Sequence, residues 1–201
     1  FLERQAPNVE KAKHAFGNIT SDGHRAGAVV ATIRANFKTD VRERKPLRVN
    51  ELVEEAVGLV DGELQKHRIM LRAESDQQLP PVSGNRVQLQ QVLVNLVMNA
   101  IEAMAAAKDE PRILSVRCAA HADNRVTVSV ADTGTGVRSA DVDQIFNPLF
   151  TTKSDGMGMG LSICRAIIEA HEGQLWFTPN TPRGAVFQFT LHANQPVSID
   201  A

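Results

Sequence analysis

Three glycines alternate with other residues in the stretch DGMGMGLSI, residues 155–163, and this stretch restricts the local structure more than any other. Glycine weakens both helices and strands, so glycines at every second position do not belong to a regular element. The residues that follow have the apolar spacing of a helix over roughly 159–171. Free N–H groups and the positive end of the helix dipole make such a helix start an anion site. We therefore interpret Gly156, Gly158 and Gly160 as a loop whose amides surround phosphate groups.

Composition limits the class of protein. The 201 residues allow one full core plus a smaller unit, and 22 basic against 23 acidic residues argue against nucleic acid or a membrane surface as partner. Cys118 and Cys164 are too far apart for a zinc motif. No apolar run approaches the roughly 20 residues of a membrane span, and the N-terminus lacks a signal-peptide layout. We expect a cytoplasmic fragment without direct membrane contact, whose parent protein is soluble or membrane-anchored.

The segment 8–44 contains no proline, and its apolar and small residues are spaced alternately three and four apart. They are Val9, Ala12, Phe16, Ile19, Gly23, Ala26, Val30, Ile33 and Phe37. This heptad pattern predicts a long helix with a narrow apolar stripe, which needs a partner helix to cover it. An amphipathic helix packed on its own domain is the alternative. The regularity of the pattern favours a helical hairpin or a homodimer bundle.

From Pro46 onward the pattern changes to short alternating helices and strands. Asn50 is a candidate cap for a helix that runs to about residue 67. We predict further helices at 86–106, near 141–146 and at 159–171, a turn-rich connector at 79–85, and strands at 69–75, 113–120, 125–131, 174–178 and 185–191. This grouping predicts an α+β fold, with helices layered on one face of a mixed sheet. The expected segments are a partial helical hairpin at 1–45, a domain at 46–194 and a tail at 195–201.

The predicted helix 86–106 has a polar stripe opposite its apolar face. The stripe consists of Gln88, Gln91, Asn95, Asn99 and Glu102, at spacings of three and four. Asparagine is a poor helix former, so two asparagines four residues apart on a plain solvated face are unexpected. Amide oxygens suit Mg²⁺, an ion that combines few protein ligands with nucleotide phosphates. The alternative is an ordinary solvated surface.

Two further stretches carry candidate binding residues. In DTGTGV, Asp132 ends a predicted strand and is followed by Gly134 and Gly136. A tight turn with an Asx-type bond is one interpretation, but a turn needs only one glycine. Two glycines would let the backbone approach a flat ligand such as adenine, whose exocyclic amine can donate to the carboxylate. In IFNPLFTTK, Lys153 directly precedes the glycine loop, and no Walker A or dinucleotide motif occurs.

Taken in order, NLVMNAIEAM, DTGTGV, IFNPLFTTK and GMGMGLSI resemble the N, G1, F and G2 boxes of the histidine-kinase ATP-binding domain. Gyrase, the Hsp90 chaperones and MutL share this family. The likeness covers residues 46–192. It implies a Bergerat-type α/β sandwich that binds ATP and Mg²⁺, preceded by a long dimerisation helix. The helix 8–44 resembles the second helix of the dimeric hairpin, with residues 1–7 as the end of the first.

The resemblance also implies roles for single residues. Asn99, with Asn95 nearby, would bind Mg²⁺ and the phosphates, and both would act in catalysis with Lys153. Asp132 would accept a hydrogen bond from the adenine amino group. The base pocket would be shaped by Gly134, Gly136 and Val137, with Thr190 completing the adenine contacts. The triphosphate would be held by Gly156, Gly158, Gly160 and Leu161, and segment 151–158 would close over it.

For function, the resemblance implies transfer of the γ-phosphoryl group to a histidine of the dimerisation domain, for relay to an aspartate of a response-regulator receiver domain. Hydrolysing members carry a glutamate where Asn95 stands; an amide cannot accept a proton, so slow hydrolysis is expected. No histidine of the chain lies in an H-E-x-x-x-P motif. We expect the phosphoacceptor upstream of residue 1 in a longer protein, and we interpret the six histidines present as solvated or structural.

One departure from the family concerns Glu102 and Ala103, which stand where some kinases carry a basic residue. Phosphate charge would then be neutralised by Mg²⁺, Lys153 and the loop amides. The alternative function is a nucleotide-dependent protein-binding switch or an anti-sigma-type serine kinase of the same superfamily. Anti-sigma kinases lack a long dimerisation helix, so the heptad segment argues against that branch.

Overall fold

The computed structural model describes residues 44–76, 78–107, 111–121, 123–153 and 156–194. The chain divides into two compact units, Phe1–Arg42 and Glu43–Ala201. The first unit lies outside the described residues, and so do the heptad pattern at 9–37 and the tail at 195–201. The dimerisation helix and the expected segment boundaries therefore stay predictions. Everything below concerns the second unit.

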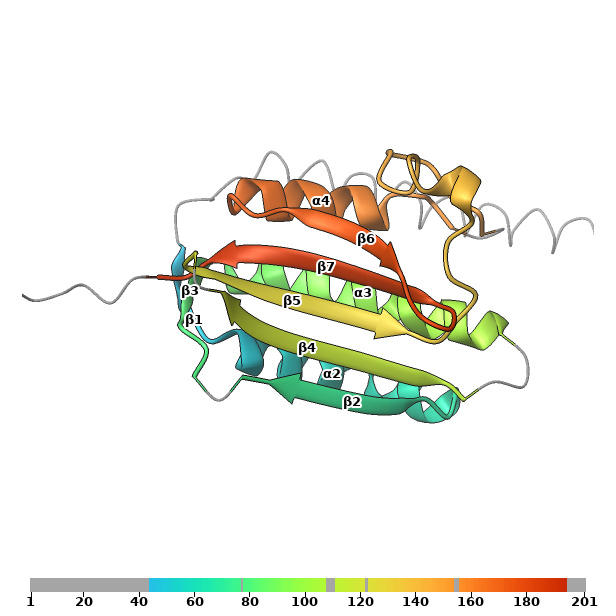
Figure 1. The fold of residues 1–201 in the computed structure, drawn as a ribbon, viewed down its shortest axis with the longest axis horizontal. Helices are drawn as coiled ribbons and strands as arrows, with labels where there is room; N and C mark the ends of the chain where they lie inside the picture. Colours follow the sequence, from blue (N-terminus) through green and yellow to red (C-terminus); the bar gives the residue numbers. More distant parts are fainter. Residues whose placement is uncertain (1–43, 77, 108–110, 122, 154–155, 195–201) are drawn as a thin grey trace, which may run out of the picture. The chain divides into compact units, whose positions relative to one another are not determined.

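A five-stranded mixed sheet forms the frame of the second unit (Figure 1). Its strands stand in the order β2 (Met70–Ser75), β4 (Ile113–His121), β5 (Arg125–Asp132), β7 (Ala185–His192) and β6 (Leu175–Pro179). Strand β2 runs parallel to β4, and the other neighbours are antiparallel. A separate two-stranded sheet pairs β1 (Lys45–Leu47) with β3 (Val82–Gly84). The predicted mixed sheet is confirmed.

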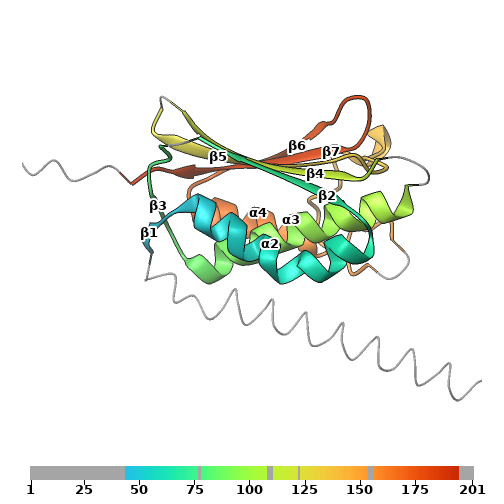
Figure 2. The same cartoon turned by 90° about the horizontal axis from the view of Figure 1, so that it is seen from below.

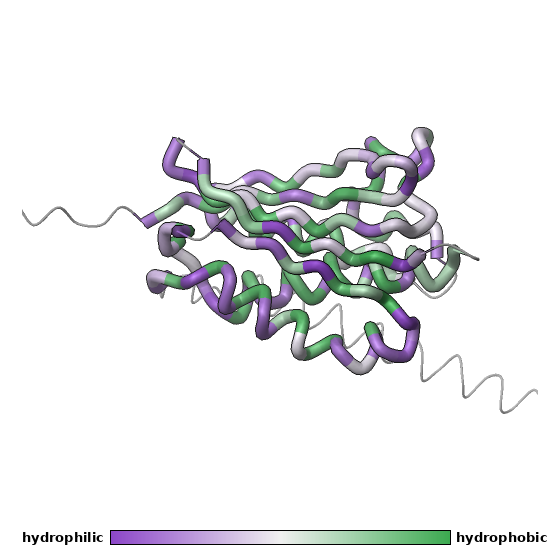
Figure 3. The backbone as a smooth tube through the Cα atoms, turned by 60° about the horizontal axis from the view of Figure 1, so that its bottom comes forward, coloured by the Kyte–Doolittle hydropathy of each residue, from purple (hydrophilic) through white to green (hydrophobic). Residues whose placement is uncertain are grey.

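The helices α2 (Val49–Lys66), α3 (Arg86–Ala106) and α4 (Gly160–Ala170) cover one face of the sheet (Figure 2). Hydrophobic and hydrophilic residues alternate along the strands (Figure 3). In β5 the side chains of Val126, Val128 and Val130 are buried in the core. Since strand residues alternate between faces, Asp132 at the end of β5 lies on the same face as these valines. The end of β5 therefore places a carboxylate on the helix side of the sheet.

Helix α3 is the central helix of the core. The Asn85 side chain accepts a hydrogen bond from the N–H of Gln88 at 3.2 Å and so caps its start. By length and composition alone α3 could cross a membrane, which differs from the expectation drawn from the sequence. Its apolar side is instead buried within this unit, through Leu89, Val92, Leu93, Leu96, Val97, Ala100, Ile101 and Met104. This burial makes α3 a core helix and leaves its polar stripe for the site.

Three local predictions were wrong. Helix α2 starts at Val49, and Arg48 is its N-cap without a side-chain bond, so Asn50 lies inside the helix rather than capping it. The connector 79–85 contains β3, whose three residues are too few to give a periodic signal. The expected helix near 141–146 is a single 3₁₀ turn at Ser139–Asp141 followed by further turns. Arg138 Nε donates to the buried Asp141 carboxylate at 2.6 Å and stabilises this turn.

Candidate functional site

The side chain of Asp132 is buried, and its two carboxylate oxygens differ in their hydrogen bonds. Oδ1 accepts hydrogen bonds from the N–H of Gly134 at 2.7 Å and of Ala185 at 3.3 Å. No donor among the described residues bonds Oδ2, and this atom is not fully enclosed by protein. Burial raises the pKa of the Asp132 carboxyl, although the two N–H groups lower it. Oδ2 can therefore accept a hydrogen bond from a donor group of a ligand.

The loop after Asp132 rests directly on α3. A Cβ on Gly134 would lie 2.6 Å from the carbonyl carbon of Ala103, so only glycine fits there. The N–H of Thr135 donates to the carbonyl of Ala103 at 3.3 Å. Val137, further along the loop, is half-buried and packs against the core. The loop is held by α3 four residues beyond Asn99, which places Asp132 and Asn99 on neighbouring parts of one site.

The turn between β6 and β7 is a second wall of the site, which the sequence analysis missed. Asn180 Nδ2 donates to the main-chain carbonyl of Asp132 at 2.7 Å. Gly184 has φ +113°, and a Cβ there would lie 1.9 Å from the same carbonyl oxygen. Arg183 Nε donates to the carbonyl of Gly134 at 3.2 Å. The residues NTPRG are typical of a turn, but nothing in their pattern indicates contact with a loop 48 residues away.

Helix α4 begins without a side-chain cap. Met159 is its N-cap residue, and the N–H groups of Gly160, Leu161 and Ser162 have no acceptor among the described residues. The first intrahelical bond runs from the N–H of Ile163 to Met159. Unbonded N–H groups at a helix start carry partial positive charge and attract anions. The start of α4 thus has N–H groups that can attract an anion.

The glycines before α4 play different parts. Gly158 has φ +67°, and its backbone lies so close to Leu149 and Phe150 that a Cβ would come within 2.5 Å of both. The N–H of Gly156 donates to the carbonyl of Lys153 at 3.3 Å. Gly160, at the helix start, faces open space. Residues 154 and 155 lie outside the described residues.

The polar stripe of α3 contacts two other elements. Lys153 Nζ donates to Asn99 Oδ1 at 3.0 Å and forms an ion pair with Glu102. Asn95 instead lies beside Cys164 on α4, whose thiol donates to the carbonyl of Val92 at 3.9 Å. Burial raises the pKa of that thiol to about 12, so Cys164 is an inert packing residue. The structure brings Asn99 and Lys153 together and leaves Asn95 at the interface of α3 and α4.

The segment between the two glycine regions is fixed to the core by aromatic contacts. The ring of Phe146 meets that of Phe187 on β7 edge-on, with centroids 6.4 Å apart. The Arg165 guanidinium of α4 lies 5.5 Å from the Phe146 centroid, a cation–π distance. Leu161 is half-buried and packs on the same core. These contacts join the segment around Phe146 to α4 and the sheet.

Thr190 does not belong to this site. Asp132 has Ala185 as its neighbour on β7, and Thr190 is five residues further along that strand, opposite Thr127. An odd separation along a strand places two residues on opposite faces, so Thr190 lies on the face away from the helices. Its Oγ1 accepts from the N–H of Gln174 at 3.1 Å. The expected adenine contact of Thr190 is therefore wrong.

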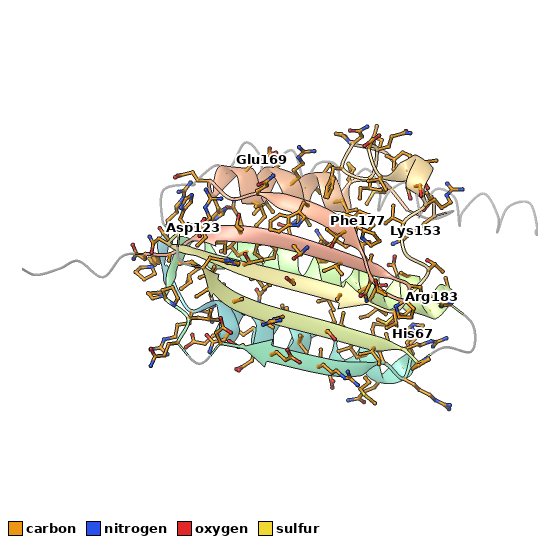
Figure 4. The ribbon with its side chains drawn as sticks, in the orientation of Figure 1. His67, Asp123, Lys153, Glu169, Phe177 and Arg183 are labelled. Atoms are coloured by element: carbon orange, nitrogen blue, oxygen red, sulfur yellow. The ribbon has the colours of Figure 1, made fainter. Side chains whose placement is uncertain are left out.

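Different charged side chains lie at the two ends of the sheet. Figure 4 places Lys153 and Arg183 toward the end where β5 finishes, and Asp123 at the opposite end. Within the described residues no group of three or more histidine, cysteine, aspartate or glutamate side chains could hold a metal ion.

Residues 84–195 match the family described as "Histidine kinase-, DNA gyrase B-, and HSP90-like ATPase". The chain belongs to this family. The matched span includes α3, the Asp132 loop, Lys153 and the start of α4, so it contains the whole site described above. The family and the fold expected from the sequence are confirmed.

Relatives and solved structures agree with this assignment. The sensor protein FixL of Bradyrhizobium diazoefficiens is 39% identical over 187 residues, which are 93% of this chain and 37% of FixL. The chain thus spans little more than a third of that relative. The catalytic domain of histidine kinase ThkA superposes with a TM-score of 0.67 at 36% identity, over 75% of this chain and 96% of that domain.

Two further structures contain a ligand or a partner. ThkA in complex with the response regulator TrrA gives a TM-score of 0.72 at 30% identity, over 96% of this chain and 54% of ThkA. Full-length ShkA in complex with AMPPNP gives 0.66 at 25% identity, over 76% of this chain and 32% of ShkA.

Proposed function

We propose that this chain is the ATP-binding catalytic part of a two-component sensor histidine kinase. It would bind ATP with Mg²⁺ and transfer the γ-phosphoryl group to a histidine of a dimerisation domain, for relay to a receiver aspartate. The observation that carries the proposal is Asp132, whose Oδ1 is filled by two main-chain donors while Oδ2 has no donor among the described residues. The complex of AMPPNP with ShkA supports a nucleotide as the ligand.

At the base end, Asp132 Oδ2 would accept the exocyclic amine of adenine. Gly134 and Gly136 bring the main chain close to α3 and to the turn before β7, and the flat ring would lie beside Val137. A buried site that bonds an amine rejects a base lacking it, because the carboxylate would then be left unpaired. The base end would therefore favour adenine over a base that lacks an exocyclic amine.

At the phosphate end, Asn99 would hold Mg²⁺ with Asn95 as its neighbour. Lys153, the amides of Gly156 and Gly158, and the N–H groups at Gly160 and Leu161 would bind the triphosphate. Mg²⁺, when bound, neutralises charge that develops on the transferring phosphoryl group. The site needs no covalent residue of its own, since it acts by positioning and electrostatic stabilisation.

The phosphoryl acceptor is not one of the described histidines. Both ring nitrogens of the buried His171 are engaged, with the N–H of Asn85 and the carbonyl of Ile167. His121 and His192 lie at the end of the sheet away from Asp132, beside Arg125. His67 lies 3.4 Å from Glu63 on α2. An acceptor histidine elsewhere in the full protein fits this arrangement.

The partner assignments rest on the relatives. The complex of ThkA with TrrA supports a response-regulator receiver domain as the downstream partner. A homodimer through helix 8–44 and a cytoplasmic position, in a parent protein that is soluble or membrane-anchored, complete the proposal. Relatives that are named sensor histidine kinases, such as TmoS and ZraS, favour this function over a serine kinase or a nucleotide-dependent switch.

The test is phosphoryl transfer with the full 201-residue chain. The protein is incubated with labelled ATP, Mg²⁺ and either a fragment bearing an H-box helix or a serine substrate. We expect acid-labile label on the histidine fragment, and much less of it when Asp132→Asn protein is used at the same ATP concentration. Acid-stable label on serine would overturn the assignment, and nucleotide-dependent partner binding without label would favour the switch.

A further inference from the structure

Lys153 Nζ lies between two oxygen-bearing side chains of α3. It donates to Asn99 Oδ1 at 3.0 Å and pairs with the carboxylate of Glu102. Asn99 and Glu102 are three residues apart, so they share one face of the helix. Glu102 is the acidic side chain that stands where some related kinases carry a basic one, and the proposed function above gives it no role.

The two sets of contacts compete for the same atoms. Asn99 Oδ1 is the proposed metal ligand, and in the structure it accepts from an ammonium group. Lys153 is the proposed phosphate ligand, and in the structure it pairs with a carboxylate. A second cation beside Asn99 and a second set of anions beside Glu102 are both electrostatically unfavourable. Lys153 therefore cannot bind the metal-bound triphosphate and keep its ion pair with Glu102 at the same time.

We infer that Glu102 competes with the nucleotide phosphates for Lys153, and so sets the affinity of the site for Mg²⁺-bound nucleoside triphosphate. Binding moves Lys153 from Glu102 to the phosphates and frees Asn99 Oδ1 for the metal. This inference rests on the proposed function. It assigns Glu102 a determining role in affinity, without contact to the reacting atoms.

A plain surface ion pair is the competing explanation. Lys153 and Glu102 are 45% and 49% exposed, and exposed pairs contribute little to folding. The two explanations differ in nucleotide binding rather than in stability. A surface pair unrelated to the site leaves affinity unchanged when it is removed, whereas a competitor for Lys153 raises affinity when it is removed.

The experiment is calorimetry of AMPPNP with Mg²⁺ on the full chain, comparing wild type with Glu102→Gln, Lys153→Met and the double variant. We expect Glu102→Gln to bind about two- to five-fold more tightly, the range set by an exposed ion pair. The gain should be smaller in the Lys153→Met background, where no pair exists to break. It should also shrink as salt screens the charges.

The matched control is Glu63→Gln on α2. Glu63 is 40% exposed and pairs with Lys66 at 3.0 Å, so the change removes the same charge from a similar pair on another helix. Affinity should then stay at the wild-type value. Unchanged or weaker binding by Glu102→Gln, with binding by wild type intact, overturns the inference alone. Absence of binding by the wild-type protein overturns the proposed function and the inference together.

Discussion

The base end and the phosphate end of the site are built differently. At the base end, the loop after Asp132 and the turn before β7 are locked to each other by main-chain contacts and by Asn180. At the phosphate end, the first N–H groups of α4 have no acceptor among the described residues, and Gly160 faces open space. The geometry of the base end is fixed by contacts within the protein. The phosphate end offers N–H donors that would be bonded only by a ligand.

This difference divides the two tasks of a nucleotide site. Recognition of a flat base needs fixed geometry, because one misplaced acceptor loses the hydrogen bond that gives selectivity. The phosphates instead change position and charge during transfer, so their site needs donors that can adapt. Disrupting a main-chain contact at the base end should therefore destabilise the fold, whereas a change at the phosphate end should leave the fold intact.

Gly184→Ala tests the rigid end and should have the largest effect. At φ +113° an alanine is strained, and its Cβ would overlap the carbonyl oxygen of Asp132. We expect the free energy of unfolding to fall by about 2–4 kcal/mol, from backbone strain together with overpacking. Denaturant unfolding measures this loss. A fall below 1 kcal/mol would mean that the turn adapts easily and that the base end is not rigid.

Asp132→Asn separates binding from folding at the same end. The amide oxygen can still accept from Gly134 and Ala185, and removing a buried charge lessens the cost of burial, so we expect stability to be kept. Losing a hydrogen bond to a charged group should weaken ATP binding roughly 10- to 100-fold. Calorimetry with Mg²⁺-ATP and a thermal melt on the same sample check both parts. Unchanged affinity would remove Asp132 from the site.

The sequence predicts one wall of the base end but not the other. Asp132, Gly134 and Gly136 are contiguous in the chain, and their spacing alone indicates a loop that approaches a ligand closely. The other wall could not be predicted, because Asn180 and Gly184 reach Asp132 only through the pairing of β5 with β7. The local sequence pattern therefore indicates the loop after Asp132, whereas the residues that contact this loop from the β6–β7 turn follow only from long-range strand pairing.

The misplaced residues follow the same rule. Helix α3 was predicted because its apolar spacing runs over 21 residues, and its boundaries agree with the structure. Thr190 was misplaced because an odd count along β7 moves a side chain to the other face, which depends on where the strand begins. The ion pair of Lys153 with Glu102 joins residues 51 apart, and no sequence spacing indicates it.

His171 tests the contact between α3 and α4 at the opposite end of α4 from its start at Gly160. Its ring joins the end of α4 to the first turn of α3, through the N–H of Asn85 at 3.0 Å. Burial lowers the pKa of His171 below 6.5, and Arg44 acts in the same direction. Near pH 6.5 His171 therefore binds a proton more readily in the unfolded chain than in the folded protein. Stability should rise with pH up to about 6.5, by at most about 1.4 kcal/mol per pH unit.

The measurement is the free energy of unfolding between pH 5 and pH 8, for wild type and His171→Gln. The variant lacks the titrating group, so its curve should be flatter below pH 6.5 and parallel to wild type above that value. Equal slopes at low pH would show that His171 is protonated in the folded protein as readily as in the unfolded chain. The junction of α3 and α4 would then not depend on a neutral ring.

Gly160→Ala should have a small effect on folding, opposite in sign to that of Gly184→Ala. Gly160 is the first residue of α4, its φ is not positive, and an added Cβ meets no atom within 4 Å. Alanine restricts the unfolded chain and favours the helix, so stability should rise by about 0.4–1 kcal/mol. If the open space receives the phosphates, the methyl group should nevertheless weaken Mg²⁺-AMPPNP binding several-fold. Greater stability with unchanged affinity would place the phosphates elsewhere, and the contrast between the two ends would then lose its functional meaning.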